Sequence, residues 1–270
     1  MLPSPFPYQG SKRLLAAQVA ARWHRPIRVL YEPFAGSAAM ALHALAHGLC
    51  ERVVIGEQLP ELAGLWQLIL SNPNGLADHY AALWPEPLAY TAVRARFNQH
   101  RDPADLLYLL LRCVKAAVRF DRTGNFNQSA DLRRVGRRPV ALRQDLLRVQ
   151  ALLMGRTEVR CGDWLATLSD ATPADFAYLD PPWQGTSVGK DPRYYQGLAR
   201  DRLVNGLMLL RARGLRFALS YDGTRGDASF VEPFPEALHL EHHLLVGGRS
   251  AQATLLGRRE DTRESLYLAQ

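Results

Sequence analysis

The chain has 270 residues, of which 47% are hydrophobic and 22% are charged, and its formal net charge is +7. A chain of this length can bury one large core, with or without an inserted module. No apolar run reaches about 18 residues and the first residues have no charged and apolar leader, so we expect neither a membrane protein nor a secreted one. The three cysteines (Cys50, Cys113 and Cys161) lack the spacing of a zinc site or a disulfide framework, and we expect a reducing, cytoplasmic location.

Positive charge is concentrated in one part of the sequence. Residues 94–148 contain 13 Arg or Lys and five Asp or Glu, a net charge of +8, whereas the remainder of the chain carries −1. Twelve of the 13 are Arg, whose planar guanidinium suits bidentate contacts with phosphate or guanine. This pattern favours a polyanionic partner, although a solvated basic face without a ligand would have the same composition.

The first predicted unit is a turn followed by a helix. Gly10 and Ser11 permit a tight turn, and residues 14–23 predict a helix. Backbone amides of such a turn beside Lys12 could hold a carboxylate, but an ordinary loop has the same residues.

A strand, a loop of small residues and a helix follow. Residues 28–31 predict a strand, and Glu32-Pro33-Phe34-Ala35-Gly36-Ser37-Ala38 leads from it into a helix over residues 39–49. This order begins a nucleotide-binding α/β unit, and small residues let the backbone approach a ligand, although the dinucleotide fingerprint is absent. A second strand over residues 52–55 is followed by Glu57, where an acid commonly holds ribose hydroxyls; a surface acid is the alternative.

Residues 57–148 predict helices, because apolar residues recur at a spacing of three to four. The second half predicts a return to the sheet. Strands are expected over residues 157–160, 176–179 and 215–220, a helix over 200–213, and an antiparallel pair over 238–246 and 264–268. Residues 185–195 predict a mobile loop over the site. His242 and His243 would point to opposite faces of a strand, so we expect no metal site there.

Asp180-Pro181-Pro182-Trp183 directly follows the strand predicted over residues 176–179. Two prolines cannot continue a ladder, so the carboxylate is expected at the end of the strand. A carboxylate and a neighbouring backbone carbonyl both accept hydrogen bonds, and together they suit an exocyclic amine with two N–H groups. Trp183 offers a flat face to a planar ring. By itself the tetrapeptide also fits an ordinary turn.

Four stretches in one order resemble a known family. They are Tyr8-Gln9-Gly10-Ser11-Lys12, Glu32-Pro33-Phe34-Ala35-Gly36-Ser37, Gly124-Asn125-Phe126-Asn127 and Asp180-Pro181-Pro182-Trp183. The chain resembles the Dam-like, alpha-class (D12) adenine-specific DNA methyltransferases. This resemblance implies S-adenosylmethionine as cofactor, double-stranded DNA as partner, and a prokaryotic or phage origin, with a restriction endonuclease as a further possible partner.

The resemblance also implies a fold and a set of site residues. We expect an α/β, Rossmann-like class I methyltransferase sheet formed by residues 1–58 and 153–270, with a helical target-recognition insert at 59–152. The implied catalytic residues are Asp180, Pro181, Pro182 and Trp183. The implied cofactor-binding residues are Tyr8, Gly10, Lys12, Glu32, Phe34, Gly36, Ser37, Glu57, Asp163, Trp164 and Asp180. The residues that we expect to bind DNA are Arg119, Arg122, Asn125, Asn127, Gln128, Arg133, Arg134, Arg137 and Arg138, and no metal is expected.

The sequence departs from the family pattern in two ways. Tyr8, Ala38, Glu57, Leu59 and Trp183 stand where tryptophan, glycine, aspartate, asparagine and tyrosine are frequent, which puts details of cofactor contact in doubt. The usual Val-Pro-aromatic-Gly after Asn127 is replaced by Gln128-Ser129-Ala130-Asp131, so GATC is not assumed as the recognised sequence. Adenine N6 methylation of DNA is the expected activity. Methylation of cytosine N4 or of RNA adenine, and an inactive DNA-binding relative, are the alternatives.

Overall fold

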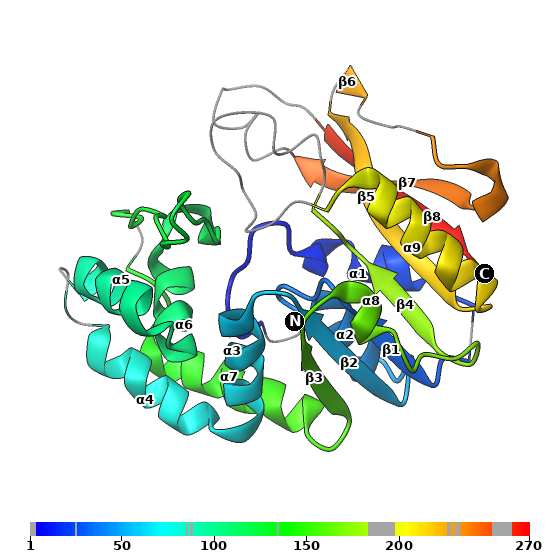
Figure 1. Ribbon diagram of the computed structural model, residues 1–270. Helices are drawn as coiled ribbons and strands as arrows, with labels where there is room; N and C mark the ends of the chain where they lie inside the picture. The colour runs from blue at the N-terminus through cyan, green and yellow to red at the C-terminus, as the bar shows by residue number, and fades with distance from the viewer. Residues whose placement is uncertain are drawn as a thin grey trace.

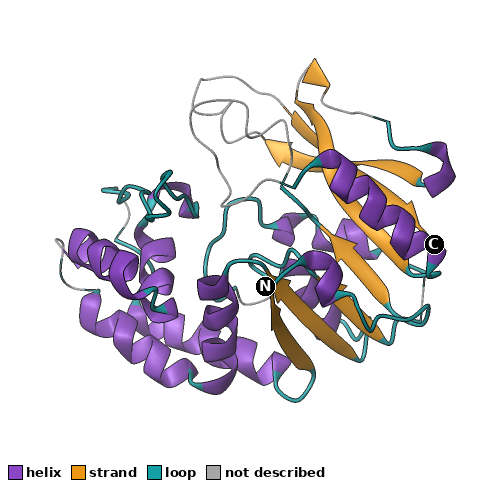
Figure 2. Cartoon of the chain, in the orientation of Figure 1, coloured by secondary structure: helices purple, strands orange, loops and turns teal. Residues whose placement is uncertain are grey.

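The computed structural model describes residues 4–24, 26–84, 86, 89–133, 135–182, 198–225, 228–229, 233–249 and 261–270. These residues form a twisted sheet with helices on its faces and, beside it, a group of helices that contains no sheet strand (Figure 1, Figure 2). Among the described helices, none has the length and apolar character needed to cross a membrane.

The sheet is doubly wound and Rossmann-like. Its strands are β1 (Val29–Glu32), β2 (Arg52–Glu57), β3 (Thr157–Cys161), β4 (Phe176–Leu179), β5 (Arg216–Arg225), β6 (Ala228–Ser229), β7 (Glu241–Arg249) and β8 (Asp261–Ala269). Their order is β3-β2-β1-β4-β5-β8-β7, with β6 paired to β5. The first five strands are parallel, and β8 is antiparallel to both β5 and β7, which confirms the expected antiparallel pair.

The strand order reverses between β1 and β4. The chain moves outward from β1 through β2 to β3, and then returns to place β4 on the other side of β1. In doubly wound sheets, ligands bind in the crevice outside the carboxyl ends of the strands at such a reversal. The topology therefore indicates where a site should be sought: at the residues that follow β1 and β4.

Alternate strand residues enter two different cores. Leu30 and Phe176 belong to the core that includes α1 (Ala16–Ala20) and α2 (Ala39–Ala46). Their neighbours Tyr31 and Ala177 belong to the core formed with α8 (Trp164–Thr167) and α9 (Arg200–Ala212). Since successive side chains of a strand point to opposite faces, each face of the sheet is covered by its own helices.

The helical part spans residues 60–153, close to the expected insert at 59–152. Its helices are α3 (Pro60–Ser71), α4 (Pro73–Leu83), α5 (Ala89–His100), α6 (Pro103–Arg112) and α7 (Pro139–Leu153). Four of them have proline in the first turn, where a missing N–H costs no helical hydrogen bond. Leu106 and Leu146 share one core with the α2 face of the sheet. The helical part therefore packs against the sheet as a continuation of that core.

Two elements differ from the expected ranges. The helix expected over residues 14–23 is observed as a 3-10 turn, η1 (Lys12–Leu14), followed by the short helix α1; the Ser11 hydroxyl bonds to Ser37 Oγ at 2.7 Å and makes no capping hydrogen bond. β5 continues beyond Ser220 through a bulge at which Asp222 has φ of 54°. Pairing with β8 resumes after the bulge, so the strand is longer than its apolar pattern predicts.

Asp105 joins three helices of the helical part. Its fully buried carboxylate accepts hydrogen bonds from Arg96 Nε (2.7 Å) on α5 and from His79 Nε2 (2.8 Å) on α4. Burial opposes the charge, but the Arg96 guanidinium and His79 hold the pKa of Asp105 below its ordinary value. The three helices thus share one buried, doubly paired charge.

Replacing Asp105 with Asn should lower the free energy of unfolding by about 3 kcal/mol, the low end for a buried ion pair because Arg96 and His79 are partly exposed. Urea denaturation followed by circular dichroism measures this change. Asp102→Asn is the matched control: Asp102 caps α6 by accepting from the Ala104 N–H at 2.8 Å, and Asn caps equally well. Equal stability of the two variants would contradict the role of Asp105.

Candidate functional site

A lysine held between two carboxylates lies at the carboxyl ends of the strands. Lys12 Nζ is 3.0 Å from Asp180 Oδ1 and 2.5 Å from Glu264 Oε1. The side chains are 10%, 19% and 14% exposed, respectively. Asp180 directly follows β4, Lys12 belongs to η1 and Glu264 belongs to β8. We call these three residues the Lys12 cluster; it occupies the strand ends where the order reverses.

Burial and charge set the protonation of the cluster. Burial raises the pKa of Asp180 to about 6; Lys12 opposes this rise and Glu264 adds to it. Burial by itself would lower the pKa of Lys12, but the two carboxylates raise it above its ordinary value. At neutral pH the cluster therefore holds an ionised Asp180 and a charged ammonium. No group of three or more His, Cys, Asp or Glu in the described part of the chain could hold a metal ion.

Glu32, the last residue of β1, fixes the start of α2. Its buried carboxylate accepts hydrogen bonds from the Ala41 N–H (2.7 Å) and the Met40 N–H (3.3 Å). Burial raises the pKa of Glu32 to about 8, although these two N–H groups oppose the rise. Glu32 therefore secures the helix that follows the loop, whereas the family resemblance implies a contact with the cofactor.

The loop between β1 and α2 is held from three sides. The Gly36 N–H donates to Glu57 Oε2 at 3.1 Å, and the Gly36 carbonyl accepts from Trp66 Nε1 at 2.9 Å. Ser37 bonds to Ser11. Gly36 has φ of 49°, and a Cβ at this position would lie 2.8 Å from the Tyr8 ring. Glycine is thus required both by the backbone conformation and by the packing of Tyr8.

Glu57 lies at the end of β2 and is oriented by backbone donors. Besides Gly36, its carboxylate accepts from the Gln58 N–H (3.0 Å) and the Leu59 N–H (3.4 Å). Burial raises the pKa of Glu57, and these three N–H groups oppose the rise. A carboxylate offers about four acceptor positions, so one remains for a further donor at the strand end.

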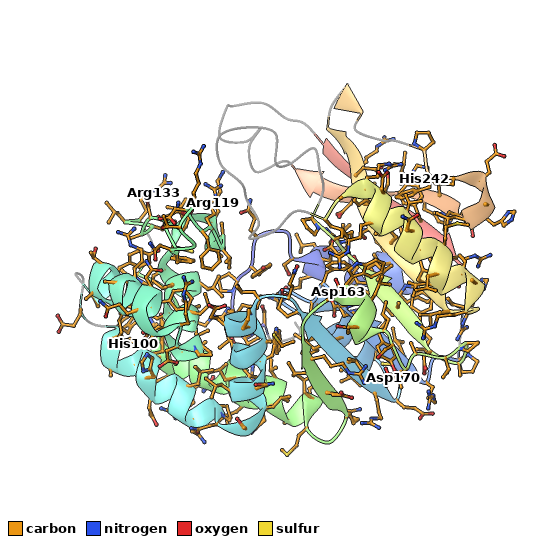
Figure 3. The ribbon with its side chains drawn as sticks, viewed as in Figure 1. His100, Arg119, Arg133, Asp163, Asp170 and His242 are labelled. Carbon is orange, nitrogen blue, oxygen red and sulfur yellow. The ribbon has the colours of Figure 1, made fainter. Side chains whose placement is uncertain are left out.

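Phe34 and Trp164 bring aromatic rings to the same edge. Their centroids are 5.6 Å apart, and Trp164 is buried where a Cβ on Gly206 would collide with its indole ring. Asp163 caps α8 by accepting from the Leu165 N–H at 3.0 Å, and it also accepts from Arg202. The labelled Asp163 in Figure 3 lies at the strand ends, next to α8.

The remaining motif residues are placed as follows. Gly10 has φ of 84° in the turn that precedes Lys12. The adjacent Gln9 N–H donates to the Ala116 carbonyl at 3.1 Å, which ties this turn to the segment after α6. Pro181 is buried and Pro182 is half-buried. Trp183 and the loop expected over residues 185–195 lie outside the described residues.

Five of the expected DNA-binding residues are exposed on the helical part: Arg122, Asn125, Asn127, Arg133 and Arg138. Asn125 sits in a turn closed by the Asp121 carboxylate, which accepts its N–H at 3.0 Å. Arg119 is half-buried, and Figure 3 shows it near Arg133 at one end of the helical part. Arg134 lies outside the described residues.

Two expected DNA-binding residues have internal partners instead. Gln128 is buried and its amide donates to the Val114 carbonyl at 2.8 Å. Arg137 Nη1 donates to the Ser4 carbonyl (2.7 Å) and to Asp145 Oδ2 (2.8 Å). The polar groups of both residues thus have partners within the protein, and a contact of either residue with DNA stays a prediction.

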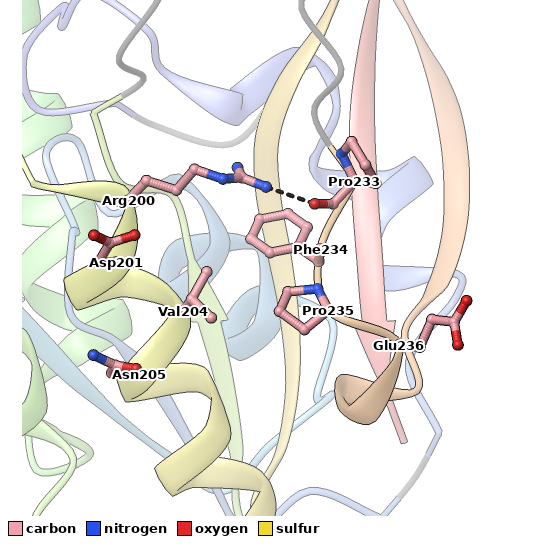
Figure 4. A pocket seen from close by; sticks show the side chains of 8 residues that line it. All are labelled: Arg200, Asp201, Val204, Asn205, Pro233, Phe234, Pro235 and Glu236. Atoms are coloured by element: carbon pink, nitrogen blue, oxygen red, sulfur yellow. Dashed lines mark hydrogen bonds between the residues drawn. The ribbon is translucent and has the colours of Figure 1, made fainter.

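A separate pocket of about 670 Å³ lies beside α9. It is lined by Arg200, Asp201, Val204, Asn205, Pro233, Phe234, Pro235 and Glu236 (Figure 4). The guanidinium of Arg200 lies 4.7 Å above the Phe234 ring and donates to the Pro233 carbonyl at 2.8 Å. The pocket shares no residue with the Lys12 cluster or with the loop of Gly36. We therefore place the candidate site at the strand ends and not here.

Sequence reasoning misses Glu264 and the role of Trp66. Glu264 is in the last strand, far from every motif, and its neighbourhood has the pattern of an ordinary strand; only the pairing of β8 beside β5 brings it to Lys12. Trp66 belongs to an apolar helix stripe, as its spacing predicts, but its indole N–H also holds the Gly36 carbonyl. Neither contact leaves a local signal in the sequence.

Comparison with known proteins identifies a family. Residues 8–221 match the D12 class of N6 adenine-specific DNA methyltransferases. A DNA N-6-adenine-methyltransferase of Escherichia phage P1 is 24% identical over 208 residues, 72% of this chain and 26% of that protein. Modification methylase StsI of Streptococcus sanguinis is 23% identical over 236 residues, 81% of this chain and 35% of that protein. The chain thus spans about a quarter to a third of the length of these relatives.

Among solved structures, an rRNA methyltransferase, aviRa from Streptomyces viridochromogenes, covers 97% of this chain and 86% of its own, at 18% identity and a TM-score of 0.43. The superposition is loose, so the assignment of the fold relies on the strand order and directions given above.

Replacing Gly36 with Ala should abolish cofactor binding, because the new methyl group displaces Tyr8 from the loop. Calorimetric titration with S-adenosylmethionine measures it. Gly48→Ala is the matched control: Gly48 also has positive φ, but no atom lies within 4 Å of its added Cβ. Both variants bear the backbone strain of roughly 1–2 kcal/mol. Normal binding by Gly36→Ala would show that the loop does not contact the cofactor.

Proposed function

This chain belongs to the D12 class of N6 adenine-specific DNA methyltransferases, and we propose that it transfers the methyl group of S-adenosylmethionine to the N6 amine of an adenine in double-stranded DNA. The observation that carries this proposal is the position of Asp180. Its carboxylate is buried, follows β4 at the reversal of the strand order, and is ionised at neutral pH beside Lys12. A site of this kind suits a neutral amine that needs an acceptor.

Asp180 would act by orienting and polarising the amine. The lone pair of an adenine amine is delocalised into the ring, so the amine is a weak nucleophile. Hydrogen bonds from its two N–H groups to the Asp180 carboxylate and the Pro181 carbonyl localise the lone pair and aim it out of the ring plane. Because the site is inside the protein, the adenine must leave the duplex to reach it.

The residues at the strand ends fit S-adenosylmethionine. The bound cofactor supplies an activated methyl group on a positively charged sulfur. Glu57 would accept from its ribose hydroxyls, Asp163 and Trp164 would hold its adenine, and the loop at Gly36 permits close approach of the backbone. Asp180 and Glu264 outnumber Lys12 at the strand ends, and this excess of carboxylates suits a cationic ligand.

DNA would be bound by the helical part. Arg122, Arg133 and Arg138 are exposed and cationic, and Asn125 and Asn127 are exposed amides that can match base edges. One relative is named a DNA N-6-adenine-methyltransferase, and another is named a modification methylase. We extend this to a possible partner restriction endonuclease, and to a cytoplasmic location beside the DNA of a prokaryote or phage. The recognised sequence does not follow from these residues.

Replacing Asp180 with Ala should reduce methyl transfer by roughly two to three orders of magnitude, as expected when a preorganised polar group is removed. Transfer of a radioactive methyl group to DNA measures it, with RNA and adenine-free DNA as parallel substrates. An unchanged circular dichroism spectrum shows that the variant is folded. Near-normal turnover by Asp180→Ala would contradict the assignment, and transfer to RNA or to cytosine would assign a different acceptor.

Arg133→Ala should weaken binding to every DNA sequence and reduce the salt dependence, by a log–log slope of about 0.9 for each phosphate that is no longer neutralised. Asn127→Ala should leave the slope unchanged and relax sequence preference by roughly 1–3 kcal/mol. Salt titrations with specific and scrambled duplexes separate the two effects. Gln144→Ala, an exposed amide on α7, is the control for Asn127. If both variants change affinity alike at wild-type slope, this surface does not read DNA.

A further inference from the structure

Glu264 reaches the Lys12 cluster from the opposite end of the chain. It lies in β8, where it is paired with Gly223 of β5 just beyond the bulge and with Leu245 of β7. Its Oε1 is 2.5 Å from Lys12 Nζ, which is closer than Asp180 Oδ1 at 3.0 Å. Both carboxylates are largely buried, so neither contact is a loose surface ion pair. A single ammonium is thus paired with two carboxylates.

The shared ammonium affects how strongly Asp180 can accept a hydrogen bond from the target amine. An ammonium that bonded only to Asp180 would occupy one of its acceptor positions and withdraw negative charge from the other oxygen. The adenine amine is a weak donor and needs a strong acceptor. A second carboxylate takes part of the Lys12 bonding and so leaves Asp180 more basic.

We propose that Glu264 is a positioning residue that holds the Lys12 ammonium and thereby keeps Asp180 a strong acceptor for the amine of the target adenine. This inference rests on the proposed function, since it assigns Glu264 a part in the same site. It adds a residue that lies outside every sequence motif, and beyond residue 221, where the match to the family ends.

Among the described residues, the charged and titratable groups around Asp180 come from four elements. Lys12 is on η1, Glu32 ends β1, Tyr178 is on β4 and Glu264 is on β8. Lys12 lowers the pKa of Asp180 and Glu264 raises it. Asp180 in turn acts on the pKa of Glu32 and of Tyr178, which are both raised mainly by burial. Lys12 is the one cation among these four groups.

The sign of the expected pH effect follows from these charges. Methyl transfer requires ionised Asp180, so kcat/KM of the wild-type protein should fall as the pH decreases through about 6. Glu264→Gln removes a negative charge and leaves Lys12 to Asp180 alone, which lowers the pKa of Asp180. The acidic limb of the profile should therefore move to lower pH.

Although the activity of Glu264→Gln should extend to lower pH, its rate at neutral pH should be lower than that of the wild-type protein. With Lys12 bonded to Asp180 alone, the carboxylate becomes a weaker acceptor, so kcat at neutral pH should fall roughly two- to tenfold, the loss expected when one hydrogen bond is weakened, while KM for DNA changes little. Glu264→Asp keeps the charge but shortens the side chain, so it should lie between the wild-type protein and Glu264→Gln in both measurements. Glu241→Gln, an exposed acid on β7, is the matched control and should leave both unchanged.

A second measurement needs no substrate. Infrared difference spectra follow ionisation of the Asp180 carboxylate, identified by its loss in Asp180→Asn, in the wild-type and Glu264→Gln backgrounds. The midpoint should be lower without Glu264. If Glu264→Gln does not fold, Glu264→Asp is used in both measurements and should shift them in the same direction by less.

The outcomes separate the two proposals. Absence of methyl transfer by the wild-type protein would contradict the proposed function, whereas the infrared midpoint would still report the charge coupling. Coincident pH profiles and midpoints in the wild-type and Glu264 variants would overturn the role of Glu264, even if methyl transfer is normal. A lower kcat without any shift in pH would assign Glu264 a structural role only.

Discussion

The Lys12 cluster is the constraint on which the site depends. Lys12 precedes the first sheet strand, Asp180 follows β4, and Glu264 belongs to the last strand of the chain. Charges that are removed from water remain ionised only when they are paired, so the three side chains must arrive together. They do so because β8 lies between β5 and β7, so that only β5 separates it from β4. The ends of the chain are therefore as necessary to the site as the motifs at its centre.

The two parts of the molecule carry opposite charge where a ligand would meet them. The strand ends present Asp180 and Glu264 around one lysine, and this excess of carboxylates would suit a cationic methyl donor. The helical part presents exposed arginines, which suit phosphates. The net charge of the whole chain does not show this separation of acidic and basic regions. Under the proposed function, the same separation would let one protein bind two ligands of opposite charge at different places.

Much of the site can be predicted because its signals are local. Two prolines after an apolar run place Asp180 at a strand end, and a glycine between a strand and a helix places Gly36 at the loop. The strand ranges and the antiparallel pair are predictable for the same reason. What cannot be predicted depends on partners distant in sequence. The turn before Lys12 suggests only that this lysine could face a ligand carboxylate. The pairing of β8 in the sheet brings the Glu264 carboxylate to Lys12, and the sequence gives no sign of this contact.

The hairpin between Cys113 and Ala130 shows why composition overestimates the binding surface. Residues 119–129 within it are rich in polar side chains, yet Phe126 is buried, and the Asn98 side chain exchanges two hydrogen bonds with the Phe126 backbone, at 2.7 and 3.2 Å. Tyr90 and Gln128 add further internal bonds. Each of these contacts removes a polar group from the outer surface and fixes the backbone beneath Asn125 and Asn127. Ordering a loop before its ligand arrives reduces the entropy lost on binding. Gln128 thus helps to hold the backbone that carries the exposed amides of Asn125 and Asn127.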